Sequence, residues 1–154
     1  MSILDQISSN QVLMSAVMGW LVAQVLKALI DLWSTGSFRI ERLYGNGGMP
    51  SSHSATVCGL AAGSAYARGF GSFEFAISFV LAMVVMIDAM GVRRETGKQS
   101  RLLNMMMEEE FWNFDDPENF QIRLKEFIGH TPLQVFCGAV LGILVAMVAE
   151  YGFY

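Results

Sequence analysis

Residues 11–33 read QVLMSAVMGWLVAQVLKALIDLW, a stretch of 23 residues whose only charged side chains are Lys27 and Asp31. A helix needs about 20 mostly apolar residues to cross the hydrocarbon core of a bilayer. Three further stretches of this kind follow, at 54–70, 73–91 and 132–152. The pattern predicts an all-α integral membrane bundle of about four spans. The short stretch 54–70 is expected to be tilted or sheltered by the other three.

The rest of the composition agrees with a membrane protein. Of the 24 charged side chains in the 154 residues, 14 fall within residues 92–131. An apolar fraction of 53% argues against disorder, and a net charge of −4 without a basic face argues against nucleic-acid binding. We therefore predict one membrane domain, 1–154, with a charged insertion at 92–131. Apolar spacing predicts surface helices at 98–112 and 117–128 within that insertion.

Lysine and arginine are distributed unequally between the two predicted sides of the membrane. With four spans, the loops 34–53 and 92–131 lie on one side, and the other side has only Arg68 at its edge. The two loops hold eight basic residues: Arg39, Arg42, Arg93, Arg94, Lys98, Arg101, Arg123 and Lys125. Basic loops stay in the cytoplasm. We expect both loops there and both termini outside.

The segment GGMPSSHSA at 47–55 predicts a turn that leads into a helix. The first N–H groups of a helix lack intrahelical partners and favour an anion such as phosphate. Ser51 and Ser52 are small enough for phosphate oxygens to approach the backbone, and His53 follows them directly. The alternative is that Ser51 or Ser52 only caps the helix.

The second of the two histidines, His130, precedes the last span on the same predicted side. Two histidines at neighbouring helix starts fit a nucleophile and an acid, although each alone could be an ordinary polar residue. The patterns CGxxxG at 58–63 and 137–142 would let these two helices cross closely, which places both histidines at one level. A metal site is not expected, because the histidines lack neighbouring cysteine or carboxylate ligands at the usual spacing.

Charged residues near the ends of the spans complete the candidate site. Lys27 lies inside the first span, where it either pairs with Asp31 or serves a function. Arg93 and Arg94 either anchor the third span at the interface or hold a phosphate. Asp88, at the end of the same span, could pair with Arg93, with Arg94 or with a histidine.

Several motifs together resemble a known superfamily. These are GGMPSSHSA at 47–55, DAMGVRRETGKQ at 88–99, LLN at 102–104 and GHTPLQVFCGAVLGILVA at 129–146. They are similar to the divergent, short bacterial and plastid branch of the type-2 phosphatidic acid phosphatase and vanadium haloperoxidase superfamily. The resemblance runs from about Lys27 to Ala146.

This resemblance implies a metal-independent, cofactor-free phosphatase that works through a phosphohistidine. It makes His130 the nucleophile and His53 the acid that protonates the leaving alcohol. It implies that phosphate is held by Ser52 and its backbone, by Lys27 and by Arg94, with Arg93 and either Arg39 or Arg42 as further candidates.

The sequence also departs from the superfamily pattern. The residue four after His130 is Gln134 instead of a carboxylate, a role that Asp88 could fill. The residue seven after Lys27 is Ser34, where the superfamily has Arg-Pro. A carboxylate partner would stabilise the imidazolium, and its loss from a serine-protease triad costs about 10⁴ in rate.

We therefore expect hydrolysis of a lipid phosphomonoester at the cytoplasmic face of a bacterial cytoplasmic membrane. The first alternative is a lipid-phosphate-binding or transport protein without catalysis, which Gln134 favours. The second is a structural membrane subunit in which the motif serves packing, and haloperoxidase activity is the weakest option. The sequence leaves open whether two copies form a homodimer through the glycine-rich helices or the first span.

Overall fold

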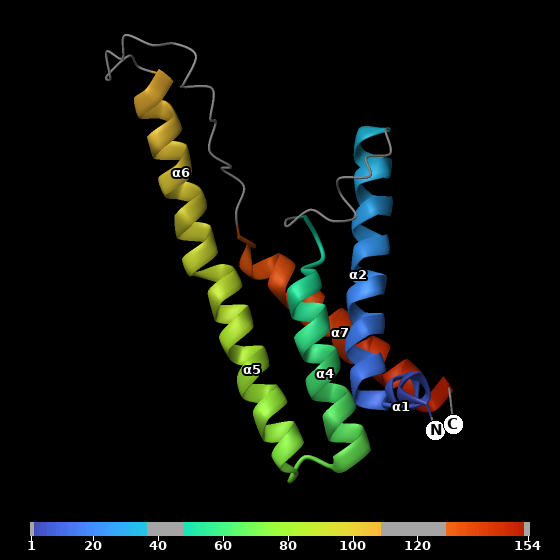
Figure 1. Cartoon of the computed structure of the whole chain (residues 1–154). Helices are drawn as coiled ribbons and strands as arrows, with labels where there is room; N and C mark the ends of the chain where they lie inside the picture. The colour runs from blue at the N-terminus through green and yellow to red at the C-terminus, as the bar shows by residue number, and fades with distance from the viewer. Residues whose placement is uncertain (1, 37–47, 109–128, 153–154) are drawn as a thin grey trace.

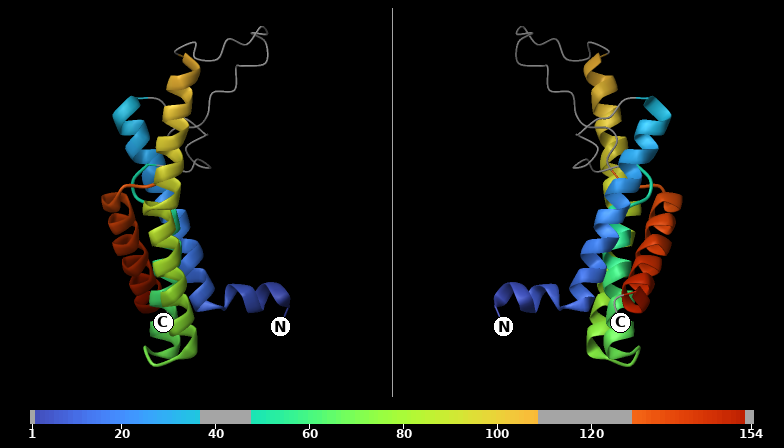
Figure 2. Two further views of the ribbon diagram at one scale, coloured as in Figure 1. Left: turned by 90° about the vertical axis from the view of Figure 1, so that its left-hand side faces the viewer. Right: turned by 90° about the vertical axis from the view of Figure 1, so that its right-hand side faces the viewer.

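The computed structural model describes residues 2–36, 48–108 and 129–152, and all regular structure in them is helical. The helices are α1 (Ile3–Ser8), α2 (Gln11–Thr35), α4 (Ser52–Arg68), α5 (Phe73–Met90), α6 (Val92–Glu108) and α7 (Pro132–Gly152). The four stretches predicted from the sequence thus correspond to α2, α4, α5 and α7, and the all-α fold is confirmed (Figure 1). The short α1 was not predicted and runs across the bundle axis (Figure 2).

Three of the helical segments are long and apolar enough to cross a membrane: Gln11–Thr35, Phe73–Met106 and Pro132–Gly152. The fourth predicted stretch forms α4, which has 17 residues and packs against α2, α5 and α7. Most residues of α4 are buried, whereas α5 exposes large apolar side chains such as Phe79, Val80 and Val84. The expectation that this short helix is sheltered by the other three therefore agrees with the structure.

Glycines allow the backbone of α4 to lie directly against the backbones of α2 and α7. A Cβ at Gly142 of α7 would lie 2.2 Å from the carbonyl oxygen of Ala55. A Cβ at Gly138 would lie 2.3 Å from the carbonyl oxygen of Ser51. A Cβ at Gly19 of α2 would lie 2.8 Å from the same Ala55 oxygen and 3.8 Å from Cα of Gly142, so the three helices meet at this carbonyl. Helices in lipid approach this closely only where small residues face each other. The predicted close crossing is confirmed.

The helix predicted at 98–112 begins six residues earlier, at Val92, and continues the line of α5 (Figures 1 and 2). The reason is that helical hydrogen bonding persists across Gly91. The Gly91 N–H donates to the Ile87 carbonyl at 2.8 Å, and the Glu95 N–H donates to the Gly91 carbonyl at 3.0 Å. The end of this predicted helix and the whole of the helix predicted at 117–128 lie outside the described residues.

The glycine contacts generate a stability prediction. The change Gly142→Ala places a methyl group against the Ala55 carbonyl, so α4 and α7 must move apart. Overpacking of this kind costs about 1–3 kcal/mol, measured as the free energy of unfolding in detergent. The matched control is Gly152→Ala on the same helix, where a Cβ meets nothing within 4 Å. Equal stability of the two variants would contradict the packing argument.

Candidate active site

The two histidines meet at one end of the bundle. His53 is the second residue of α4, and His130 lies two residues before the start of α7. Their ring centroids are 5.9 Å apart and the rings are tilted by 58°. Figure 1 shows the first residues of α4 and α7 at the same level, between the longer α2 and the rod formed by α5 and α6. The expected convergence of the histidines is therefore observed, and a single phosphoryl group could contact both rings.

Main-chain contacts hold His130 against the junction of α5 and α6. Its N–H donates to the carbonyl of Ala89 at 2.9 Å. The preceding residue, Gly129, has φ of +99°, and a Cβ there would lie 2.5 Å from the backbone nitrogen of Arg94. Only glycine combines that backbone conformation with so close an approach. As a result, His130 is only 4% exposed.

Gln134 determines which nitrogen of His130 carries the proton. The Thr131 N–H donates to Oε1 of Gln134 at 3.0 Å, which fixes this atom as the amide oxygen. The same oxygen lies 3.2 Å from Nδ1 of His130. Because a carbonyl oxygen only accepts, Nδ1 must be protonated, and Nε2 keeps its lone pair in the neutral ring. Nε2 is therefore the atom of His130 that can act as a nucleophile.

Sequence reasoning missed Thr131, although its signal was present. The Thr131 hydroxyl accepts from the Gln134 N–H at 3.3 Å, so Thr131 and Gln134 satisfy each other's backbone N–H groups. This is a capping box, which the sequence TPLQ at 131–134 encodes with proline in the first helical turn. One glutamine thus starts α7 and orients the imidazole.

Lys27 faces the site from α2. Its ammonium donates to the hydroxyl of Ser52 at 2.9 Å, and both side chains are buried. Ser51 has the capping role that the sequence left open, because its fully buried hydroxyl accepts from the N–H of Ser54 at 3.3 Å. The two serines therefore differ: Ser51 closes the start of α4, and Ser52 lies beside the lysine ammonium.

Arg93 is paired with Asp88, one of the partners considered for that carboxylate. Its Nε lies 2.7 Å from Oδ2 of Asp88, and both side chains are half-exposed. Both residues also lie within electrostatic reach of His53. Arg94 contributes its backbone to the contact with Gly129, and its side chain is exposed. Arg39 and Arg42 lie outside the described residues. Arg93 thus lies within electrostatic reach of both histidines, whereas the contact of Arg94 with this region is through its backbone.

The surroundings of His130 favour its neutral form. Burial is the main cause that lowers its pKa, and the positive charges of Lys27 and Arg93 lower the pKa further. The hydrogen bond with Gln134 acts in the opposite direction. A neutral imidazole with a free Nε2 is the reactive form of a histidine nucleophile.

His53 has an uncommitted polar atom. Its Nδ1 is buried and has no hydrogen-bond partner within the described ranges. Buried polar atoms are rarely left unpaired, and such cases occur at catalytic sites and where a bound group supplies the partner. The His53 ring lies 5.9 Å from the His130 ring and within electrostatic reach of Lys27 and Arg93, so an incoming phosphate would find positive charge there.

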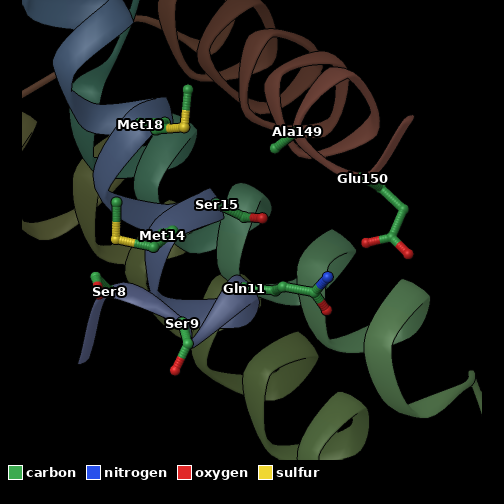
Figure 3. Close-up of a pocket in the computed structure, with 8 residues that line it drawn as sticks. All are labelled: Ser8, Ser9, Gln11, Met14, Ser15, Met18, Ala149 and Glu150. Atoms are coloured by element: carbon green, nitrogen blue, oxygen red, sulfur yellow. The ribbon is translucent and has the colours of Figure 1, made fainter. Parts of the chain in front are cut away.

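A hollow of about 290 Å³ lies at the opposite end of the bundle, between α1, α2 and the end of α7 (Figure 3). Its lining includes Ser8, Gln11, Ser15 and Glu150 but neither histidine and no lysine or arginine. The Glu150 carboxylate would repel a phosphate. The histidine end is therefore the candidate site for an anionic ligand.

Comparisons with known proteins identify the family. The model described as the divergent PAP2 family matches residues 8–145. The chain is 35% identical over 156 residues to the "Uncharacterized membrane protein YuiD" of Bacillus subtilis (strain 168), with 96% of this chain and 99% of that protein covered. No solved structure matches the chain. The chain therefore belongs to the divergent PAP2 family, as the motifs indicated, and it is a membrane protein.

The hydrogen bonds of His130 can be tested by ¹⁵N NMR of the protein in lipid nanodiscs. At neutral pH we expect Nδ1 protonated and Nε2 unprotonated, with a protonation midpoint below the ordinary value of about 6.5. Gln134→Leu should give a mixture of tautomers, because the acceptor is lost. Arg93→Gln should move the midpoint to higher pH, because a positive charge is removed. A protonated Nε2 in the neutral wild-type ring would contradict the assignment.

Proposed function

We propose that this member of the divergent PAP2 family hydrolyses a lipid phosphomonoester through a phosphohistidine on His130. The observation that carries the proposal is the histidine pair, in which the buried His130 and the half-buried His53 lie 5.9 Å apart, together with the buried Lys27 ammonium. Phosphoryl transfer requires mainly a positioned nucleophile, an acid for the leaving group and positive charge around the phosphoryl oxygens. The described residues supply one group for each of these tasks.

In the first step, Nε2 of His130 attacks the phosphorus atom. The N–P bond forms as the bond between phosphorus and the lipid oxygen breaks. Protonated His53 transfers its proton to the departing oxygen, which leaves as the lipid alcohol. Lys27, the Ser52 hydroxyl and Arg93 stabilise charge on the other phosphoryl oxygens.

In the second step, water replaces the protein as the phosphoryl acceptor. Neutral His53 takes a proton from the water molecule as its oxygen attacks phosphorus, and the P–N bond breaks. Inorganic phosphate leaves, and both histidines return to their initial protonation states. The hydrogen bond from Nδ1 to Gln134 keeps the His130 ring in one orientation through both steps.

Gln134 also supports a second candidate function. An amide oxygen orients the imidazole but adds no negative charge to stabilise the positive charge that develops when Nε2 attacks. A protein with this site could therefore bind a lipid phosphate without releasing phosphate. Such a binding or transport protein would hold the phosphate with the same cationic side chains. It would differ from the phosphatase only in releasing no inorganic phosphate.

Phosphate release decides between these functions. The purified protein in mixed micelles is given phosphatidic acid, phosphatidylglycerol phosphate or a polyprenyl phosphate. We expect release from at least one lipid, a loss of about 10³-fold or more for His130→Ala, and a loss of about 10²–10⁴-fold for His53→Ala. Gln134→Glu should be faster than wild type, because a carboxylate stabilises the imidazolium.

The exposed change Gln99→Ala on α6 is the control and should keep full activity. Alkaline quenching with a ³²P-labelled substrate should trap label on His130, because phosphohistidine is stable to base. A folded protein that binds lipid phosphate but releases none would establish the binding function instead. Full activity of His130→Ala would exclude the phosphohistidine mechanism.

The orientation proposed with this function places the histidine end in the cytoplasm and both termini outside. Its support is the concentration of basic residues in the two loops at that end. In a variant with both native cysteines replaced by alanine, a cysteine introduced at Ser9 should react with an impermeant maleimide in intact cells. A cysteine introduced at Lys98 should react only after the membrane is opened. The reverse pattern would overturn the orientation.

A further inference from the structure

The short helix α1 has little support from the rest of the protein. It has six residues, none of them buried, and residues 2–10 are all exposed. Within the described part of the chain, α1 packs lightly against α2 and against no other helix. Isolated helices shorter than about 12–15 residues are marginal in water. A helix of this length that buries nothing therefore needs support from its surroundings.

The corner between α1 and α2 fixes the direction of α1. The Asn10 side chain accepts from the N–H of Leu13 at 3.1 Å and so caps the start of α2. The Asn10 N–H donates to the carbonyl of Ile7 in α1 at 3.2 Å. The chain therefore turns within two residues, and α1 runs across the bundle axis (Figure 2). Because α2 crosses the membrane, α1 lies along the membrane plane.

The level of α1 is the boundary between the bilayer and water. Figure 1 shows α1 at the same end of the bundle as the turn between α4 and α5 and the end of α7. Arg68, Glu74 and Glu150 lie on these segments, and charged residues avoid the hydrocarbon core. In contrast, α2 exposes Leu13 and Val17 on one face from its first turn onward. The hydrocarbon therefore begins directly beside α1.

The side chains of α1 divide into an apolar and a polar side. Successive residues of a helix are about 100° apart around its axis, so Ile3, Leu4 and Ile7 fall within an arc of about 100°. Their exposed fractions are 76%, 77% and 47%. Asp5 and Gln6 lie outside this arc. An exposed row of large apolar side chains opposite polar ones is typical of a helix at a membrane surface.

The polar side of α1 points away from the bundle. Ser9 continues the polar side, between the directions of Asp5 and Gln6 around the axis, and its hydroxyl donates to the Gln6 carbonyl at 3.2 Å. Figure 3 shows the Ser9 side chain pointing opposite to the course of α2 from Gln11 to Met18. The apolar side of α1 therefore points in the direction in which α2 enters the membrane.

We infer that α1 binds the lipid surface at the end of the bundle opposite to the histidines, an inference that does not rest on the proposed function. Ile3, Leu4 and Ile7 insert among the acyl chains, while Asp5 and Gln6 face water and the headgroups. Helices of this kind lie about 5–10 Å deep in the boundary between headgroups and acyl chains. Asp5 is the one charged residue of α1, so the attraction is hydrophobic and does not require anionic lipids.

Spin labels measure which side of α1 meets lipid. The protein, with both native cysteines replaced by alanine, is labelled with a nitroxide at Leu4→Cys or at Gln6→Cys in phosphatidylcholine nanodiscs. Oxygen concentrates in lipid, and a nickel chelate stays in water. The ratio of oxygen to nickel collisions should be about fivefold or more higher at Leu4→Cys, because the two side chains are about 200° apart. Adding phosphatidylglycerol should leave the ratios unchanged.

Two exposed positions calibrate the measurement. Leu21→Cys on α2 gives the ratio for lipid, and Gln99→Cys on α6 gives the ratio for water. Equal ratios at Leu4→Cys and Gln6→Cys, both close to the water value, would overturn the inference. Few collisions with either reagent at both positions would show a covering protein surface and would also overturn it. Dipolar broadening that disappears on dilution with unlabelled protein would identify that surface as a second copy.

A matched pair of charge substitutions tests the apolar side directly. With the label at Ile7→Cys, the added change Leu4→Asp should lower the ratio about threefold or more, because a carboxylate among acyl chains lifts the helix toward water. Gln6→Asp adds the same charge on the polar side and should leave the ratio nearly unchanged. The label at Leu21→Cys should respond to neither change if the bundle remains folded. An equal response of Ile7→Cys to both changes would contradict the assigned faces.

Discussion

The close approach of α4 to α7 and α2 is the contact on which the rest of the structure depends. Lipid gives apolar helices no hydrophobic reason to associate, so their association relies on packing and on interhelical hydrogen bonds. The carbonyl of Ala55 lies where a Cβ of Gly142 or of Gly19 would otherwise be. These contacts enclose a helix that is too short to cross a membrane comfortably and that carries several buried serines. The polar helix is thereby kept away from lipid by three apolar neighbours.

The same contacts bring together the two histidines of the candidate site. Gly138 lies against the carbonyl of Ser51, and the Ser51 N–H donates to the carbonyl of Gln134 at 3.0 Å, so the first two turns of α7 lie beside the start of α4. His53 and His130 belong to these two helix starts and therefore lie next to each other. Gly129 then brings the chain onto the backbone of Arg94, and the His130 N–H binds the carbonyl of Ala89. Helix packing thus determines the distance between the histidines, local backbone contacts position His130, and Gln134 orients its ring.

Sequence patterns could predict the features that depend on composition and spacing. Four apolar stretches gave the helices, and the glycine pattern at 137–142 gave the close crossing with α4 that brings the histidines together. The matching pattern at 58–63 instead lies mainly against Ser15 of α2. The patterns could not rank Arg93 above Arg94, because adjacent residues on a helix point in different directions that depend on how α6 continues α5. Nor could they show that Ser51 caps α4 while Ser52 faces Lys27. The pocket lined by Ser52 and His53 involves three helices at once, and its outline depends on α2 and α5 remaining apart.

Gln134 separates two tasks that one carboxylate would otherwise combine. A carboxylate beside Nδ1 would orient the ring and also offset the charge of the imidazolium. The amide oxygen performs only the first task, and its position is already fixed by the Thr131 N–H. No carboxylate at this position therefore offsets the positive charge of Lys27, which in the proposed function would strengthen binding of a phosphate dianion in a medium of low dielectric constant. In the proposed reaction the developing imidazolium would be less stabilised, so the replacement would favour retention of phosphate over rapid turnover. Asp88 does not restore the balance, because its carboxylate is paired with Arg93.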